Sequence, residues 1–197
     1  MSQYFENNSN LKDEKKCISI NFQNKTYPMY TNNGLFCKEH FDYGSRLLLT
    51  QVISEPLSGK ILDLGCGYGA IGIIIAKTHP QAKVDMVDIT DLALKTATDN
   101  AKLNNVKNVN IFKSNVYEKI TDKYNYIITN PPIRAGKEII RKFLIGAKDH
   151  LEKDGQLWFV MRKDHGVKTM IKELEEYYSI KISEKSKGFY IVCANVK

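Results

Sequence analysis

Glycine and acidic residues recur at short intervals in Ile61-Leu-Asp-Leu-Gly-Cys-Gly-Tyr-Gly69, between a β-rich run and an apolar helical run. Glycines let the backbone turn sharply and approach a ligand closely, and a helix start presents free N–H groups. The spacing Gly67-x-Gly69-x-x-Gly72 also fits the dinucleotide-binding fingerprint. However, Asp63 ends the strand, where its charge would face a pyrophosphate, and Gly65 extends the pattern to D-x-G-x-G-x-G. The segment therefore suits a ligand with a positively charged amino acid at one end and a nucleoside at the other.

Asp88 ends the next β-rich run, Val-Asp-Met-Val-Asp, 25 positions after Asp63. In an α/β sheet this place lies beside the glycine turn, so the Asp88 carboxylate is free to accept both hydroxyls of a ribose. The alternative is a helix cap, since Thr90 follows and a helical pattern begins there. Because the glycine motif precedes Asp88 at the usual spacing, we expect the ribose role.

A second candidate ligand loop is Asn130-Pro131-Pro132-Ile133, which follows the β-rich run 124–129. Two prolines cannot continue a sheet, and Pro131 lacks the N–H that would otherwise tie this corner down. The loop could be only a stiff turn. Because it lies at the carboxyl edge of the same α/β unit, where ligands bind, we favour a binding role.

The elements that must position these loops follow from the apolar pattern after Lys60. Expected strands are 60–64, 83–87, 109–113, 124–129, 156–161, 178–183 and 189–195, and expected helices are 71–78, 92–104, 138–150 and 167–177. Strands separated by helix-length segments predict an α/β fold, with a parallel sheet and helices on both faces. Only residues 184–188 join the last two strands, so these strands should form an antiparallel hairpin.

Residues 1–55 are expected to form an extension packed on a core domain of residues 56–197. Residues 17–30 alternate like a small β-hairpin around 23–25, and residues 43–53 look helical. Roughly 55 residues seldom build an independent core, so this part should lie against the main domain.

The D-L-G-C-G-Y-G turn with an acidic strand end downstream resembles the class I methyltransferases that use S-adenosylmethionine (SAM). The resemblance implies a Rossmann-like, seven-stranded, mostly parallel sheet whose last inserted strand is antiparallel. N-P-P before an aromatic or aliphatic residue resembles the members that methylate planar amide or amino nitrogens. There, the Asn130 side-chain carbonyl and the Pro131 backbone carbonyl would accept the two hydrogens of an exocyclic amine and direct its lone pair at the methyl carbon. Ile133 would give a ring apolar contact, with less stacking than Tyr or Phe.

Three motifs together resemble the family of ribosomal RNA small-subunit methyltransferase C: G-L-F-C-K-E-H-F-D-Y-G-S-R-L-L-L at 34–49, S-N-V-Y at 114–117 and N-P-P-I-R-A-G-K at 130–137. The likeness covers residues 31–196, and those enzymes make N2-methylguanosine in 16S rRNA. Two-domain members carry a degenerate methyltransferase unit in front of the active one. This chain is too short for that, so it resembles a compact single-unit form.

The resemblance implies a role for each matching residue. The SAM-binding residues would be Asp63, Gly65, Cys66, Gly67, Gly69, Asp88, Ile89, Asn115 near the adenine, and Asn130. Asn130, Pro131, Pro132 and Ile133 would hold the guanine, and Phe36, Lys38, Asp42 and Gly44 would cover the SAM and acceptor pocket.

The net charge of +7 is compatible with an anionic partner, and its distribution is more informative. The first 130 residues carry 15 basic and 13 acidic groups, whereas residues 131–197 carry 14 and 9. Arg134, Lys137, Arg141 and Lys142 directly follow the acceptor loop, where they could pair with phosphates of ribosomal RNA or the 30S subunit. Their alternative is a solvated helix face.

Composition excludes several other classes of protein. With 197 residues, 43% hydrophobic and 26% charged, the chain should build one packed core. No apolar run reaches the roughly 18 residues of a spanning helix, and the start has no signal-peptide pattern, so we expect a cytoplasmic protein. Cys17, Cys37, Cys66 and Cys193 are far apart and should be reduced thiols, with no metal site.

Several functions remain open at this point. The leading one is methylation of guanine N2 in 16S rRNA by a SAM-dependent enzyme. A protein glutamine N5-methyltransferase would use the same loop, although such enzymes usually have an aromatic residue in place of Ile133. A small-molecule methyltransferase, a non-catalytic SAM- or RNA-binding assembly factor, and an NAD-dependent oxidoreductase are further alternatives. The oligomeric state is open.

Overall fold

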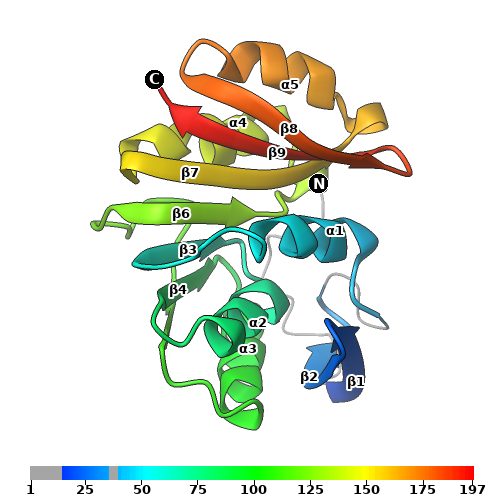
Figure 1. The fold of residues 1–197 in the computed structure, drawn as a ribbon. Helices are drawn as coiled ribbons and strands as arrows, with labels where there is room; N and C mark the ends of the chain where they lie inside the picture. Colours follow the sequence, from blue (N-terminus) through cyan, green and yellow to red (C-terminus); the bar gives the residue numbers. More distant parts are fainter. Residues whose placement is uncertain (1–14, 36–39) are drawn as a thin grey trace.

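A computed structural model of the protein describes residues 15–35 and 40–197, and within them the main sheet has seven strands in the order β5-β4-β3-β6-β7-β9-β8 (Figure 1). The pairs among β3 to β7 are parallel, and β9 is antiparallel to both β7 and β8. This confirms the predicted α/β sheet with its antiparallel C-terminal hairpin. The strands are β3 (Lys60–Leu64), β4 (Lys83–Asp88), β5 (Val109–Lys113), β6 (Tyr124–Thr129), β7 (Leu151–Arg162), β8 (Tyr178–Ser186) and β9 (Phe189–Val196).

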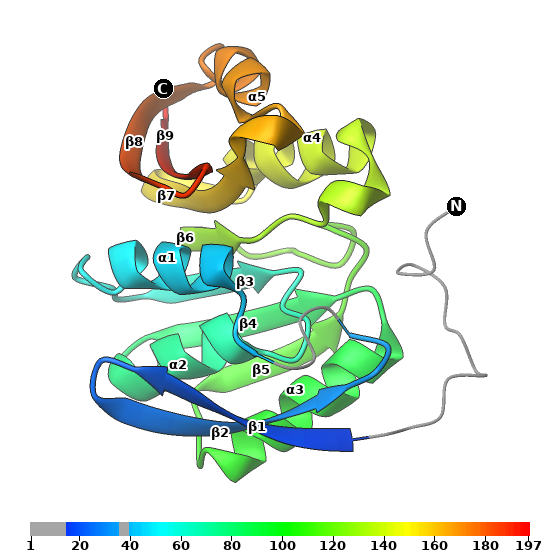
Figure 2. The same ribbon diagram turned by 90° about the vertical axis from the view of Figure 1, so that its right-hand side faces the viewer.

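Helices cover both faces of this sheet, and Figure 2 shows α1 and α4 on opposite sides of it. One hydrophobic cluster joins the sheet to α1 (Tyr43–Val52), α2 (Ala70–Thr78) and α3 (Asp91–Leu103). A second cluster joins the other face to α4 (Lys137–Ile145) and α5 (Val167–Leu174). None of the described helices is long and apolar enough to cross a membrane.

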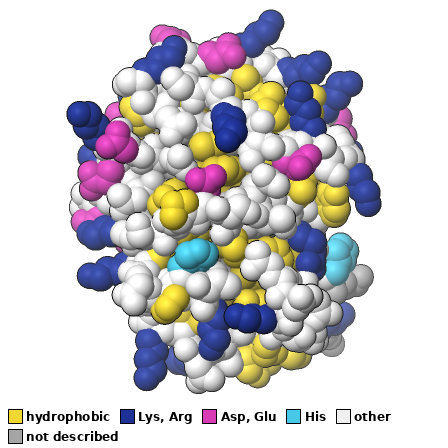
Figure 3. All heavy atoms as spheres, viewed as in Figure 1, with side chains coloured by type: hydrophobic (Ala, Val, Ile, Leu, Met, Phe, Trp, Pro, Cys, Tyr) yellow, Lys and Arg dark blue, Asp and Glu magenta, His cyan; other side chains and the backbone are white. Residues whose placement is uncertain are grey.

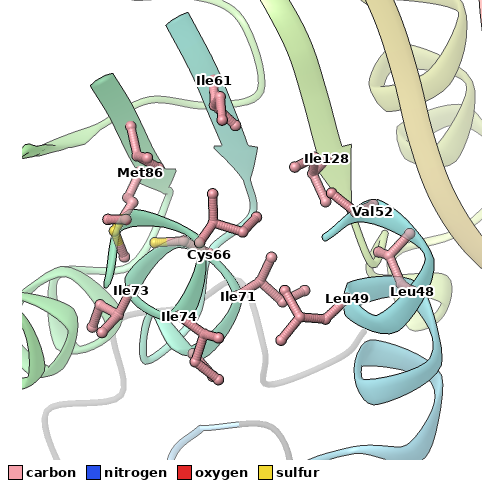
Figure 4. Packing of buried hydrophobic residues seen from close by; sticks show 14 of the residues in the cluster. Leu48, Leu49, Val52, Ile61, Cys66, Ile71, Ile73, Ile74, Met86 and Ile128 are labelled. Carbon is pink, nitrogen blue, oxygen red and sulfur yellow. The ribbon is translucent and has the colours of Figure 1, made fainter. Parts of the chain in front are cut away.

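The two clusters follow from the two-residue period of a strand, which sends successive side chains to opposite faces. In β6, Ile127 packs toward α4 and Ile128 toward α1. Residues 70–76 of α2 are all buried, because this helix lies within the first cluster. Figure 4 shows Ile71 of α2 and Leu49 of α1 pointing toward one another. This packing places the starts of α1 and α2 beside the carboxyl ends of β3 and β6.

The N-terminal strands β1 (Lys15–Phe22) and β2 (Lys25–Asn32) form the predicted antiparallel hairpin. Its two-residue turn, Gln23-Asn24, has φ of 45° and 59°, as a type I′ turn requires. The hairpin docks on α3 through Asn100, which accepts from the Tyr30 N–H at 2.6 Å and donates to the Tyr30 carbonyl at 2.9 Å. Asn100 also donates to the carbonyl of Tyr68, so one buried amide links the hairpin to the glycine turn.

Several element boundaries differ from the prediction, and α5, for example, ends at Leu174 rather than at residue 177. Strand β7 begins at Leu151, because Leu151 pairs with Tyr124 across an irregularity in register. Helix α4 ends at Ile145 and continues as a 3-10 turn, η2 (Gly146–Asp149). Strand β8 extends to Ser186, which leaves a two-residue turn, Lys187-Gly188, with φ of 47° and 81°.

Candidate functional site

A cavity of about 440 Å³ lies at the carboxyl ends of β3, β4, β6 and β7. The loops that follow these parallel strands meet there, as expected for an α/β sheet. The predicted site residues that line it are Asp42, Asp63, Gly65, Cys66, Gly67, Asp88, Ile89, Asn130, Pro131, Pro132, Ile133 and Arg134.

The glycine turn is held in shape by the neighbouring strand. The N–H groups of Gly65 and Cys66 both donate to the Val87 carbonyl at 2.9 Å, and the Gly67 N–H donates to Asp88 Oδ2 at 3.0 Å. A Cβ at Gly67 would meet nothing within 4 Å, so the backbone faces open space at this point. The turn therefore presents bare backbone to the cavity, as a close-fitting ligand requires.

Asp88 has the geometry for both roles that the sequence left open. Its Oδ1 accepts from the Thr90 N–H at 3.0 Å and from the Thr90 hydroxyl at 3.1 Å, which shapes the start of α3. The residue also lines the cavity. A carboxylate has about four acceptor positions, and Asp88 already accepts three hydrogen bonds, the one from the Gly67 N–H included, so about one position remains for a ligand.

Asp63 is 2% exposed and its Oδ2 accepts the Gly72 N–H at 2.8 Å. Burial raises the pKa of the Asp63 carboxyl to about 7, with a smaller contribution from the negative charge of Asp88. The hydrogen bond from Gly72 acts in the opposite direction. A cationic ligand group beside Asp63 would stabilise its charged form. Burial also raises the pKa of the adjacent Cys66 thiol, which is therefore a neutral, packed side chain.

The orientation of Asn130 is determined by two residues at the start of α1. Its side-chain nitrogen donates to Asp42 Oδ2 at 3.0 Å and to Ser45 Oγ at 2.8 Å. A carboxylate only accepts hydrogen bonds, so the amide nitrogen must face Asp42 and the amide oxygen must point the other way. Asp42 Oδ2 also accepts the Ser45 N–H at 2.8 Å and so caps α1.

Gly44, which was predicted to cover the pocket, does not line the cavity but packs beneath a residue that does. A Cβ at Gly44 would lie 2.8 Å from Cε1 of Phe189. Gly69 likewise lies outside the cavity lining and caps α2 with a φ of 87°. A Cβ there would come within 2.6 Å of Met86 Cε.

Asn115 does not line the cavity either. Its side chain is exposed and donates to Glu118 Oε1 at 2.6 Å. The adenine contact assigned to Asn115 stays a prediction. Phe36 and Lys38 lie outside the described residues.

The basic residues of α4 are also turned away from the cavity. Lys137 and Arg141 both pair with Glu173, at 3.0 and 2.8 Å, and Arg141 also pairs with Glu138 at 2.7 Å. Hydrogen bonds from Arg141 and Lys137 lower the pKa of the Glu173 carboxyl to about 2. Lys142 is exposed and does not line the cavity. Of the four predicted phosphate-binding residues, Arg134 alone reaches the cavity.

The sequence prediction missed residues contributed by the C-terminal strands. Arg162 at the end of β7, His165 in η3 (Lys163–His165) and Phe189 at the start of β9 all line the cavity. Phe41 and Tyr68 add further rings. No motif marks these positions, but the predicted C-terminal hairpin was a usable signal, because its turn must lie at the carboxyl edge.

These residues fit SAM better than they fit a dinucleotide. The glycine turn offers two carboxylates, Asp63 and Asp88, which suit an ammonium group and ribose hydroxyls and would repel a pyrophosphate. The basic residues that line the cavity, Arg134, Arg162 and His165, come from the end of β7 and from the loops after β6 and β7. The part of the chain that the structure describes holds no group of three His, Cys, Asp or Glu residues arranged for a metal ion.

Comparison with known proteins identifies the family of the chain. The family model described as methyltransferase small domain matches residues 26–193. The chain is 34% identical to the uncharacterized protein YbxB of Bacillus subtilis, over 97% of this chain and 96% of that protein. It is 33% identical to ribosomal RNA small subunit methyltransferase C of Psychromonas ingrahamii, over 88% of this chain and 52% of that enzyme.

A solved structure shares the fold. It is the T. thermophilus 16S rRNA N2 methyltransferase in complex with AdoMet and guanosine, with a TM-score of 0.83 and 22% identity over 93% of this chain and 51% of that one. The chain thus spans about half the length of the curated rRNA methyltransferases that it matches. From the match over residues 26–193 and the shared architecture, the chain belongs to the methyltransferase small domain family of SAM-dependent enzymes.

Proposed function

We propose that this chain transfers a methyl group from SAM to the exocyclic N2 amine of a guanine in ribosomal RNA. Two lines of support are the rRNA methyltransferases among its relatives and the planar-nitrogen loop Asn130–Ile133 at the cavity. The substrate and the position of methylation belong to this proposal.

The observation that carries it is the orientation of Asn130. Because the amide nitrogen donates to Asp42 and Ser45, the amide oxygen is the group that remains to bind the methyl-accepting substrate. Pro131 follows directly and also lines the cavity. These two carbonyls are the pair that would accept both hydrogens of an amine.

The chemistry requires this pair because an amine conjugated to a ring is a weak nucleophile, its lone pair being delocalised. Holding both hydrogens out of the ring plane directs the lone pair at the methyl carbon. When bound, SAM supplies a methyl group on a positively charged sulfur, which is already an excellent leaving group. The protein therefore contributes position and electrostatics, and Asn130 needs no acid or base function.

The cofactor side would be formed by the glycine turn, with Asp63 toward the methionine ammonium and Asp88 toward the ribose. This assignment is supported by the position of both residues in the lining of the same cavity. We also propose that residues 1–55 act as an extension of a core formed by 56–197. Asp42 and Ser45 belong to that extension and hold Asn130, so the extension completes the acceptor site.

Labelled-methyl transfer from SAM tests the proposal. The purified chain is offered 30S subunits, free 16S rRNA and protein extract, and the products are digested and analysed as nucleosides and amino acids. N2-methylguanosine is the expected product. Methylglutamine would show the protein-methylating alternative, and binding of SAM with no transfer to any substrate would show a non-catalytic module.

A further inference from the structure

The end of β7 and the start of β9 carry a cation and a ring side by side. Arg162 and Phe189 are direct partners in the antiparallel ladder, so both side chains lie on the α1 face of the sheet. The Arg162 guanidinium lies 5.1 Å from the centroid of the Phe189 ring. Both residues line the cavity.

A second ring and a second cation lie next to the Arg162–Phe189 pair, outside the cavity lining. The ring of Tyr43 lies 5.6 Å from that of Phe189, and Lys187 Nζ lies 4.9 Å from the Tyr43 centroid. Lys163 lies beside the β8–β9 turn, because its backbone N–H donates to the Gly188 carbonyl at 2.8 Å. We call Arg162, Lys163, Lys187, Tyr43 and Phe189 the hairpin rim.

The antiparallel insertion of β9 is the reason that the hairpin rim lies at the cavity. Because β9 runs opposite to β7 and β8, the end of β8 and the start of β9 reach the carboxyl edge together. Figure 1 shows the β8–β9 turn at the same end of the sheet as the arrowhead of β6. The hairpin rim therefore begins at the cavity wall and extends to the Lys187-Gly188 turn.

The hairpin rim is fixed in place by bonds between α1 and β8. The Tyr43 hydroxyl and Ser186 Oγ are 2.8 Å apart, and Ser183 Oγ donates to Gln51 Oε1 at 2.7 Å. Gly44 lets Phe189 approach α1 closely, as described above. The rings are thus preorganised, which reduces the entropic cost when a partner binds them.

The charge of this surface is positive. Lys163 and Lys187 are exposed and form no ion pair within residues 15–35 and 40–197, whereas Arg162 pairs with Asp164 at 2.9 Å. This contrasts with α4, where Glu173 and Glu138 neutralise Lys137 and Arg141. In the view of Figure 3, Lys and Arg side chains gather over α5 and the β8–β9 end of the molecule.

We propose that the hairpin rim binds the single-stranded RNA that flanks the methylated nucleotide, an inference that rests on the proposed function. Lys163 and Lys187 contact phosphates, and the partly exposed rings of Tyr43 and Phe189 offer stacking surface for bases. Cations alternating with rings are the combination that binds single strands without sequence preference. An acidic protein segment would use the cations but not the rings, which favours RNA as the partner.

Charge reversal tests this surface. The double variant Lys163→Glu/Lys187→Glu is compared with Lys83→Glu/Lys107→Glu, which changes two exposed lysines at the amino edge of the sheet by the same charge. Binding of a short, guanosine-containing, fluorescein-labelled single-stranded RNA is measured by anisotropy at several salt concentrations. The rim variant should bind about tenfold more weakly, with a salt slope shallower by about 0.7 for each phosphate that it no longer neutralises. SAM affinity, measured by calorimetry, should match that of the control.

The outcomes separate the two proposals. Equal RNA binding by the rim variant and the control would overturn the proposal that the hairpin rim binds RNA, even if the chain methylates RNA. If RNA binding depends on the hairpin rim but the chain transfers methyl groups only to protein, the proposed function is overturned and the hairpin rim remains an RNA-binding surface. Phe189→Leu, which keeps an apolar packing residue but removes the ring, should raise the KM for RNA more than it lowers kcat.

Discussion

The side-chain nitrogen of Asn130 donates to Asp42 Oδ2 at 3.0 Å, and this bond joins residues 88 positions apart. It connects the end of β6 to the N-cap of α1 and sets which end of the Asn130 amide faces the cavity. Asp42 is therefore a positioning residue: it acts on the acceptor through Asn130.

Asp42→Ala should lower the rate of methyl transfer about tenfold to a hundredfold, because Asn130 loses the partner that orients it. The same change removes the N-cap bond to Ser45 and should cost about 1 kcal/mol of unfolding free energy. Asp42→Ser separates the effects, since serine keeps a good cap but lacks the carboxylate. Thermal unfolding and single-turnover rates measure the two; normal transfer by Asp42→Ser would contradict the positioning role.

Asn130→Ala should lower methyl transfer by about 10²–10³-fold and leave SAM affinity largely intact, because it removes one of the two acceptor carbonyls. Asn125→Ala is the matched control. It makes the same change in β6, at a residue whose amide oxygen accepts the Lys60 N–H away from the cavity. Normal turnover of Asn130→Ala on ribosomal subunits would disprove the acceptor-site proposal.

Asp88→Ala should weaken SAM binding by about 1.5–3 kcal/mol, since it removes a charged acceptor and the anchor of the Gly67 N–H. Asp122→Ala removes an exposed carboxylate that pairs with Lys60 outside the cavity and should leave the Kd unchanged. Isothermal titration calorimetry gives both values. Equal SAM affinity of the two variants would refute the ribose assignment.

The raised pKa of Asp63 predicts that the stability of the fold depends on pH. Its pKa is raised to about 7 in the folded chain, so the folded state holds a proton that the unfolded state releases near pH 4. Its contribution to stability is fully present below the unfolded pKa and is lost as the pH rises from about 4 through 7. Asp63→Asn should abolish this decline in chemical denaturation curves.

SAM binding should show the opposite trend at the same residue. A ligand ammonium favours the ionised carboxyl, so SAM affinity should rise with pH up to about 7 and binding should release a proton. Calorimetry in buffers of different ionisation enthalpy detects that proton. Release of close to zero protons on SAM binding at pH 6 would argue against an ammonium contact with Asp63.

Gly69→Ala should destabilise the fold by about 1–3 kcal/mol, because φ is 87° and the new methyl group would lie 2.6 Å from Met86 Cε. Gly166→Ala is matched to it: this glycine also caps a helix, with φ of 82°, but has nothing within 4 Å of its Cβ position. The difference between the two unfolding free energies measures the clash alone. Equal destabilisation would show that backbone strain accounts for the whole effect.

The sheet and both ligand loops could be predicted from the sequence, because each rests on local patterns. Short β-rich runs located every strand of the main sheet, and the prolines at 131 and 132 marked the end of β6. The exceptions are boundaries set by distant partners. Helix α4 ends at Ile145, where the Tyr178 hydroxyl donates a hydrogen bond to the Leu144 carbonyl across 34 positions of the chain.

The candidate site divides in the same way. The types and spacing of Asp63, Gly67, Asp88 and Asn130 were sufficient to predict that they would meet, since parallel strands deliver their carboxyl ends to one edge. The predicted RNA contacts on α4 rested on charge and on the position of these residues after the acceptor loop, and the structure pairs Lys137 and Arg141 with Glu173 instead.

By itself, then, the sequence determined the family, the order of elements and the residues that meet at the carboxyl edge, because turn chemistry and apolar period are local properties. Only the tertiary structure decided how Asn130 is oriented and which cations stay exposed. Those properties depend on partners such as Asp42 and Glu173, which are distant along the chain and are brought into contact by packing.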